Sequence, residues 1–229
     1  MFESKYSKVL TIILVIIIIA ILGLLSYLGY DQYKKHKNAK EAEEFVGSYQ
    51  GDTVEFEDED NNEIDYNEKL NEIGSKPVEK NEGNTNKPNT SKKGKFKDFA
   101  TVGTMEIPSI KFNYPIIEEA TGPAIEVAVA VLYPNGENIN QPGNTVVIGH
   151  NYRNGALFSN LKRTKVGDKI YVKDYRGTKL TYTIYNKFET SAQDTSFYQR
   201  ETNGKAELTL STCTDASNNM RLIVLAKQD

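Results

Sequence analysis

The stretch from Val9 to Tyr30 contains no charged residue and is almost entirely aliphatic at its centre. Twenty residues of it, as far as Leu28, would rise about 30 Å as a helix, which matches the hydrocarbon thickness of a bilayer. A cleaved signal peptide has a shorter apolar core, of about 7–15 residues, followed by a small-residue cleavage site. Residues 26–30 form a poor site of that kind. We therefore predict a short tail (residues 1–8) and an uncleaved transmembrane helix (residues 9–30).

Residues 31–97 are highly charged. Glu41 to Glu72 holds thirteen acidic residues and one lysine, and Lys76 to Lys97 holds seven lysines against two glutamates. Such a composition offers too few apolar side chains to offset the entropy lost on ordering, so we predict a solvated linker. A short helix through Lys34 to Phe45, continuing out of the membrane, is compatible with it. We expect that deleting residues 1–95 leaves a folded, active domain.

Residues 98–229 form the predicted folded domain. Acidic residues and lysine plus arginine balance there, fourteen of each, which gives no footprint for nucleic acid. About 130 residues can bury a core without covalent staples. The chain has one cysteine, which excludes an intramolecular disulfide.

Short runs of β-branched and aromatic residues, separated by turn residues, predict an all-β fold for this domain. Seven or more strands in this length favour a closed barrel or a sandwich. The expected strands are 103–107, 114–117, 144–148, 169–172, 179–188, 206–213 and 220–226, with helical turns at 124–129 and 157–163.

The cysteine, Cys213, lies at the end of the predicted strand 206–213. Alternation along a strand puts it on one face with Thr209 and Ser211, opposite Leu208 and Leu210. A lone cysteine is often an inert buried side chain. A thiol at a strand end, beside small polar residues, is better placed to react.

Two further residues suit acyl-transfer chemistry. His150 is the only histidine of the domain; it could activate the thiol as a base and later protonate a leaving amine, or be a surface histidine. Arg221 opens an otherwise apolar strand and is either a solvated strand end or a donor to an oxyanion. Zinc spacing is absent, and Glu118 and Glu119 are weak calcium ligands, so we predict no metal or cofactor.

These residues carry a resemblance to a known family. Thr209-Leu210-Ser211-Thr212-Cys213, followed eight residues later by Arg221, resembles the sortase signature TLxTC...R. Val147 to His150 resembles the histidine motif of that family. Ile107 to Ile110 is similar to its I-P-x-I strand, and Leu161 to Ile170 to its L-x-x-x-x-x-G-D-x-I segment.

The resemblance implies an eight-stranded β-barrel with the active site in a groove at one end. It implies that Cys213 is the nucleophile, His150 the general acid or base and Arg221 the oxyanion- or substrate-binding arginine. Ser211, Thr212 and Thr214 would line the substrate groove.

The implied enzyme is a cysteine transpeptidase. It attacks the Thr–Gly carbonyl of an LPxTG-like sorting signal in a secreted protein, holds a thioester, and releases it to an amine of the cell-wall precursor or a pilin lysine. The short connection at 189–204 disfavours class B, and the lack of a second span or aromatic lid disfavours class C, which leaves a class A, D or E type. A hydrolase that uses water as acceptor and a non-catalytic binding domain are the alternatives.

The charges that flank the span and the implied chemistry predict opposite orientations for it. Lys5 and Lys8 precede it, whereas four lysines follow it between residues 34 and 40. Because lysine is enriched on the cytoplasmic side, this count favours a cytoplasmic domain. The implied chemistry takes place outside the cell, so we predict a single-pass membrane protein with a cytoplasmic N-terminus and an extracellular catalytic domain.

Overall fold

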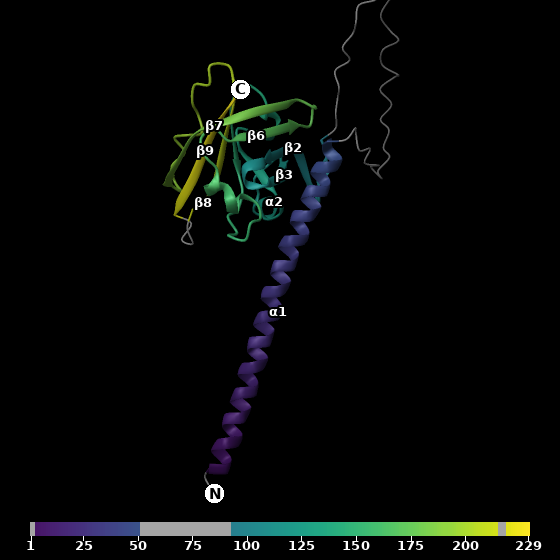
Figure 1. Cartoon of the computed structure of the whole chain (residues 1–229), viewed down its shortest axis with the longest axis vertical. Helices are drawn as coiled ribbons and strands as arrows, with labels where there is room; N and C mark the ends of the chain where they lie inside the picture. Colours follow the sequence, from purple (N-terminus) through teal and green to yellow (C-terminus); the bar gives the residue numbers. More distant parts are fainter. Residues whose placement is uncertain (1–2, 51–92, 215–218) are drawn as a thin grey trace, which may run out of the picture.

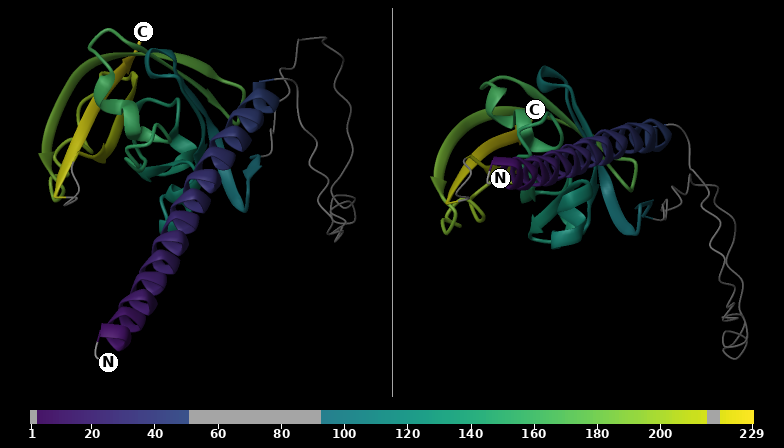
Figure 2. Two further views of the ribbon diagram at one scale, coloured as in Figure 1. Left: turned by 60° about the horizontal axis from the view of Figure 1, so that its bottom comes forward. Right: turned by 90° about the horizontal axis from the view of Figure 1, so that it is seen from below.

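The computed structural model describes residues 3–50, 93–214 and 219–229. A long helix, α1 (Glu3–Gln50), lies beside a small β-domain. The C-terminal part of α1 runs along one side of this domain, and its N-terminal part extends away from it (Figure 1). Figure 2 shows the same arrangement from two other directions. Most of the predicted linker, residues 51–92, lies outside the described residues.

Nine strands and a few helical turns make up the β-domain. The strands are β1 (Lys95–Phe96), β2 (Phe99–Ile107), β3 (Phe112–Ile117), β4 (Val129–Tyr133), β5 (Gly143–Ile148), β6 (Lys169–Asp174), β7 (Lys179–Ser191), β8 (Ala206–Cys213) and β9 (Met220–Gln228). The turns are η1 (Pro108–Ile110), α2 (Gly122–Val127), η2 (Gly136–Asn138) and η3 (Phe158–Arg163).

Eight of these strands close into a barrel, which confirms the predicted fold class. Neighbouring strands follow the order β2-β3-β4-β5-β8-β9-β7-β6, and β6 pairs back onto β2, while the short β1 pairs only with β2. The barrel closes tightly at Gly103 of β2, where a Cβ atom would lie 2.3 Å from the carbonyl oxygen of Lys173 in β6. No larger residue fits that approach without moving the backbone, so the closure needs a glycine there.

One barrel strand, β4, escaped the sequence prediction. A helical turn was expected at 124–129, but α2 ends at Val127 and β4 begins at Val129. Thr121 caps α2 by accepting a hydrogen bond from the backbone N–H of Ala124 (3.3 Å). The apolar run through residues 127–132 contains helix-favouring alanines, and a short apolar run does not distinguish helix from strand by periodicity.

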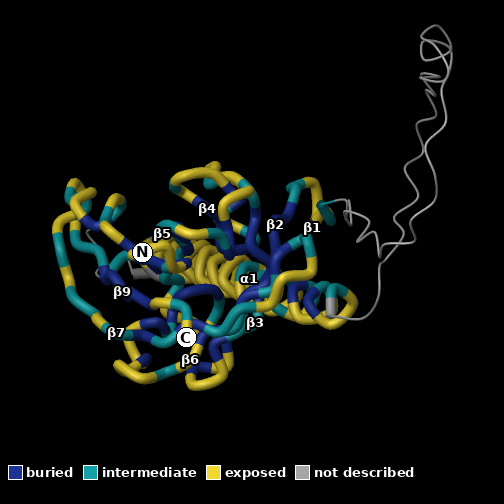
Figure 3. The backbone as a smooth tube through the Cα atoms, turned by 90° about the horizontal axis from the view of Figure 1, so that it is seen from above, coloured by how far each residue is buried: buried dark blue, intermediate teal, exposed yellow. Residues whose placement is uncertain are grey.

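Both faces of the central strand β8 are buried. Leu208 and Leu210 point into the main apolar core of the barrel. Thr209 and Ser211, on the opposite face, are also buried. They lie beside a second cluster on the outer side of the sheet, formed by Val146, Phe197, Ile223 and Leu225. Figure 3 shows buried backbone in β2 and β9, in contrast to the largely exposed α1.

The helix α1 is long and apolar enough to cross a membrane, by length and composition; its most apolar window is fully exposed in the structure. It does not end at Tyr30, however, where the span was predicted to end, but continues to Gln50. Residues 31–50, which the prediction placed in the linker, are helical here, and the helix is longer than the one considered through Lys34 to Phe45.

The continuation of α1 is docked on the barrel. Ala42 and Val46 are fully buried, and the Phe45 ring meets the ring of Phe96 at 5.4 Å. Lys173 of β6 donates to the Tyr49 carbonyl (2.8 Å). These α1 residues are spaced at intervals of three and four, as on the apolar face of an amphipathic helix. The acidic residues around them lower the average hydrophobicity of the segment, so its composition alone does not indicate a docked helix.

The β-domain also begins before the predicted boundary at residue 98. Phe96 is 4% exposed and belongs to the main core. Lys93 forms ion pairs with Glu118 (2.6 Å) and Glu137 (2.8 Å). The folded unit therefore includes residues 93–97 and the last turns of α1.

Candidate active site

Three adjacent strands bring the predicted site residues together. β5 pairs with β8 in parallel, with Ile148 opposite Ser211, and β8 pairs with β9 in antiparallel, with Cys213 directly opposite Arg221. Directly opposed residues in an antiparallel pair have Cβ atoms about 4.5–5.5 Å apart. His150 follows β5 by two residues, so all three side chains emerge at the same end of the barrel.

Hydrogen bonds fix the segment around His150 against the end of β8. The Gly149 N–H donates to the Ser211 carbonyl (3.3 Å), the Thr212 hydroxyl donates to the Gly149 carbonyl (2.7 Å), and the Asn151 amide donates to the Cys213 carbonyl (2.9 Å). A Cβ atom at Gly149 would lie 2.8 Å from Val129 and 2.9 Å from the Phe158 ring. The glycine before His150 is thus a packing requirement.

His150, Cys213 and Arg221 line one groove of about 330 Å³. All three are partly exposed. The groove is walled by apolar side chains from several elements and by a few polar ones: Ile125, Leu132, Ile148, Phe197 and Tyr198, with Asp194, Ser211 and Thr212. A larger cavity, of about 520 Å³, lies between α1 and the barrel and contains none of the three residues.

Comparison with known proteins decides the family. The family model of the sortase domain matches residues 105–229. This chain belongs to the sortase family. The resemblance read from the motifs is therefore confirmed.

Individual sortases are similar over the same region. Sortase A of Bacillus anthracis is 29% identical over 126 residues, covering 55% of this chain and 58% of that protein. Sortase A of Streptococcus agalactiae is 28% identical over 137 residues, covering 58% of this chain and 55% of that protein. The chain thus spans a little over half the length of these curated relatives.

Solved sortase structures share the fold. Sortase A from Corynebacterium diphtheriae superposes with a TM-score of 0.52 at 28% identity, covering 57% of this chain and 61% of that one. Sortase C-1 from Actinomyces oris gives a TM-score of 0.52 at 26% identity, covering 56% of this chain and 72% of that one. Matches to both sortase A and sortase C leave the subclass of this sortase a prediction.

The predicted substrate residues of this sortase differ in what they do. Ser211 and Thr212 line the groove, but the Thr212 hydroxyl is already bonded to the Gly149 carbonyl and acts as a brace. Thr214 is not among the described residues that line the groove; its N–H donates to the Met220 carbonyl (3.2 Å). The loop between them, residues 215–218, lies outside the described residues.

A buried polar network holds the outer wall of the groove, and sequence reasoning missed it. The Asn144 amide donates to the carbonyls of Phe197 (3.2 Å) and Tyr198 (2.9 Å) and accepts from the Thr209 hydroxyl (2.8 Å). Arg200 donates to the Phe197 carbonyl (3.0 Å) and pairs with Glu207 (2.6 Å). A polar residue inside the apolar strand 144–148 was the one signal available.

The positive charge of Arg221 acts on a tyrosine of this wall. Burial raises the pKa of the Tyr198 hydroxyl, and the positive charge of Arg221 opposes that rise. Arg221 and Tyr198 both line the groove. A developing negative charge in the same groove would be stabilised by the same field.

No metal cluster is formed by the residues described. Across residues 3–50, 93–214 and 219–229, no three His, Cys, Asp or Glu side chains are grouped to hold an ion. Glu118, considered above as a calcium ligand, is instead paired with Lys93.

Proposed function

We propose that this sortase is a membrane-anchored cysteine transpeptidase that acts on an LPxTG-like sorting signal. The observation that carries the proposal is the shared groove, which holds the only cysteine of the chain, the only histidine of the β-domain and Arg221. The apolar wall residues suit the apolar side chains of such a signal.

The reaction follows from these three groups. The Cys213 thiolate attacks the Thr–Gly carbonyl carbon, and Arg221 donates hydrogen bonds to the oxyanion that forms. His150 protonates the departing glycine amine, the C–N bond breaks, and the acyl group remains as a thioester on Cys213. An incoming amine gives up a proton to His150, attacks the thioester, and releases the thiolate with a new amide bond. Acceptor amines of a cell-wall precursor or a pilin lysine fit this scheme.

The placement of the groove supports action at a membrane. The end of the barrel where β8 ends and β9 begins points toward the N-terminal part of α1 (Figure 1). With residues 9–30 in a bilayer, this end of the barrel would face the membrane surface, where substrates with their own membrane spans are held. We propose that the N-terminus is cytoplasmic and the barrel extracellular.

The reaction is tested with the full-length protein in lipid nanodiscs and an LPxTG peptide. Mass spectrometry should detect a peptide thioester on Cys213 and, with an added amine, the amide product. Product formed only by addition of water, whatever the amine supplied, would indicate the hydrolase instead. An absence of both thioester and cleavage across a panel of sorting pentapeptides would reject the proposal.

The topology is tested through the same cysteine. Because Cys213 is the only thiol and is partly exposed, a membrane-impermeant maleimide should label the protein on intact cells. Labelling only after permeabilisation would place the barrel in the cytoplasm, as the lysine count favours.

A further inference from the structure

An aromatic ring packs against the His150 side chain. The imidazole of His150 and the ring of Tyr152 lie with centroids 5.0 Å apart at 32°. The segment that carries both is pinned by the Phe158 N–H, which donates to the His150 carbonyl (3.0 Å). The main chain of His150 is thus fixed by hydrogen bonds, and Tyr152 is the described ring that contacts its side chain.

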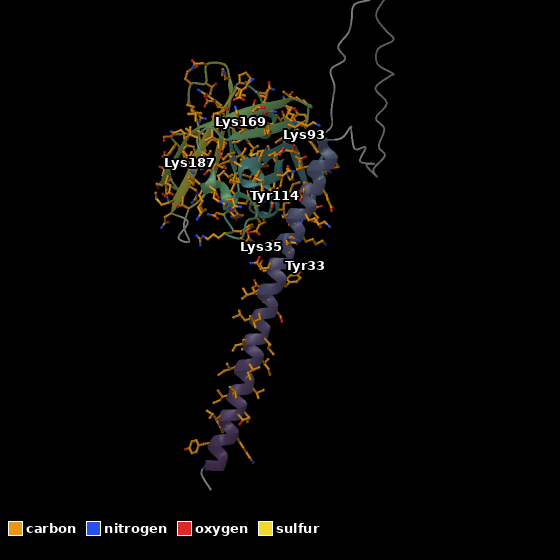
Figure 4. All side chains as sticks on the ribbon, viewed as in Figure 1. Tyr33, Lys35, Lys93, Tyr114, Lys169 and Lys187 are labelled. Atoms are coloured by element: carbon orange, nitrogen blue, oxygen red, sulfur yellow. The ribbon has the colours of Figure 1, made fainter. Side chains whose placement is uncertain are left out.

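Tyr152 is held in turn by α1. The Lys35 ammonium lies 4.8 Å from the centroid of the Tyr152 ring, a cation–π contact, and Asp31 holds Lys35 at 2.5 Å from the preceding turn. Figure 4 shows Lys35 where α1 passes the edge of the barrel. Burial, Glu126 and Asp31 together raise the pKa of the Tyr152 hydroxyl, so this group stays a neutral donor.

The neighbouring contacts of α1 reach an element that lines the groove. The Asn38 amide donates to the Val127 carbonyl at the end of α2 (2.6 Å). The Glu126 carboxylate of the same short helix accepts a hydrogen bond from the Tyr152 hydroxyl (3.2 Å), and Ile125 lines the groove. About one turn of α1, from Lys35 to Asn38, therefore touches both the partner of His150 and an element of the groove wall.

We propose that Tyr152 is a positioning residue for His150 and that α1, through Lys35, completes its placement. The docked helix is then part of the working enzyme, and the barrel is fully active only while residues 31–50 lie against it. This inference rests on the proposed function for its kinetic consequence. Its structural part, the placement of His150 beside Cys213, can be measured without substrate.

The kinetic test uses full-length variants in nanodiscs. Tyr152→Ala should lower kcat for the peptide by about tenfold or more, because a misplaced acid–base group is costly, and should leave KM nearly unchanged. Tyr152→Phe keeps the ring and should retain most of the rate. A higher KM with unchanged kcat in Tyr152→Ala, or equal losses of kcat in Tyr152→Ala and Tyr152→Phe, would overturn the role of the ring.

The contribution of the helix is isolated at Lys35. Lys35→Met keeps the apolar stem but removes the charge, and should lower kcat about two- to fivefold, the size of an exposed cation–π contact. Lys35→Arg should restore it. Lys34→Met is the matched control, because Lys34 is the exposed neighbour on the same helix. In a Tyr152→Ala background Lys35→Met should have no further effect, and equal losses from Lys34→Met and Lys35→Met would overturn the proposal.

A substrate-free measurement separates this inference from the proposed function. An imidazole beside a thiol makes that thiol react faster with alkylating agents, so the rate of iodoacetamide alkylation of Cys213 at neutral pH tests how His150 is placed. Tyr152→Ala and Lys35→Met should slow alkylation, and Tyr152→Phe, Lys35→Arg and Lys34→Met should not. If no peptide is turned over but this order holds, the positioning role stands and the substrate is wrong. If wild type and Tyr152→Ala alkylate at the same rate with the same melting temperature, the positioning role is wrong.

Discussion

The groove and the helix–barrel interface differ in how their residues can be recognised in the sequence. The groove is built from rare types, one cysteine, one histidine of the domain and one arginine in an apolar strand, so each could be singled out by identity. The interface is built from common types, Ala42, Phe45 and Val46 among glutamates and lysines, and only their spacing carries information. Catalytic residues can thus be predicted one at a time from their identity, whereas a docked helix can be predicted only from the spacing of its apolar residues.

The largest expected effect lies in the groove. Cys213→Ala should abolish both peptide cleavage and the thioester, because the chain has no second thiol. The melting temperature should stay close to that of the wild type, since Cys213 is a partly exposed strand end. Mass spectrometry of the reaction and a thermal melt check both points. Turnover above a no-enzyme control would show that the nucleophile lies elsewhere.

Arg221→Ala comes next. A donor aimed at developing negative charge is worth about a hundred- to a thousandfold in rate, so kcat/KM should fall by that much in a folded protein. Arg221→Lys keeps the charge but loses the planar fork and should recover little. Steady-state kinetics on both variants decide the matter: near-normal turnover in Arg221→Ala would make the arginine a solvated strand end, and strong recovery in Arg221→Lys would show that charge alone suffices.

The polar network behind the groove wall should give a smaller, mixed effect. Asn144→Ala removes the amide donor to the Tyr198 carbonyl and the acceptor of the Thr209 hydroxyl, which costs about 1–3 kcal/mol of unfolding free energy. Because the wall shifts, we also expect a higher KM for the peptide. Denaturant unfolding and kinetics measure the two parts. Gln199→Ala, at an exposed residue bonded to the Tyr133 hydroxyl, is the control and should change neither.

The contrast between groove and interface also explains what the sequence could predict. Seven barrel strands followed from alternation and turn residues, and the motif residues Cys213, His150 and Arg221 fall in one groove. Asn144 and Arg200 were missed because their partners, Phe197 and Glu207, are distant along the chain or ordinary in type. β4 was missed because the alanines of the run 127–132 suit a helix as well as a strand.

The docking of α1 on the barrel, and its continuation to Gln50, were missed for a different reason. Averaging charge over residues 41–72 mixed a docked amphipathic helix with the segment beyond it. A membrane helix is apolar on every side, so its composition suffices to find it. A docked helix is apolar on one side only, so the average composition of the segment does not reveal it. The roles assigned to the site residues stay predictions until the variants above are measured.

An effect on stability is expected at the interface itself. Val46 is 1% exposed against the barrel, and Val46→Asp would bury a charge, so the helix should undock instead of accommodating it. The loss is then limited to the free energy of docking, about 1.5–3 kcal/mol for a buried valine and somewhat more with its neighbours. Ser48→Asp adds the same charge at an exposed position and should leave the melting temperature unchanged.

Two truncations sharpen the same point. A chain beginning at Asp31 keeps the docked part of α1, whereas one beginning at Phe96 loses it together with the Lys93 ion pairs. The shorter chain should still fold, because the barrel closes without α1, but it should melt several degrees lower, at about 2–4 °C per kcal/mol for a domain of this size. Equal melting temperatures for the two chains, or an unchanged melt in Val46→Asp, would mean that the helix only rests on the barrel and that residues 31–50 serve as a spacer after all.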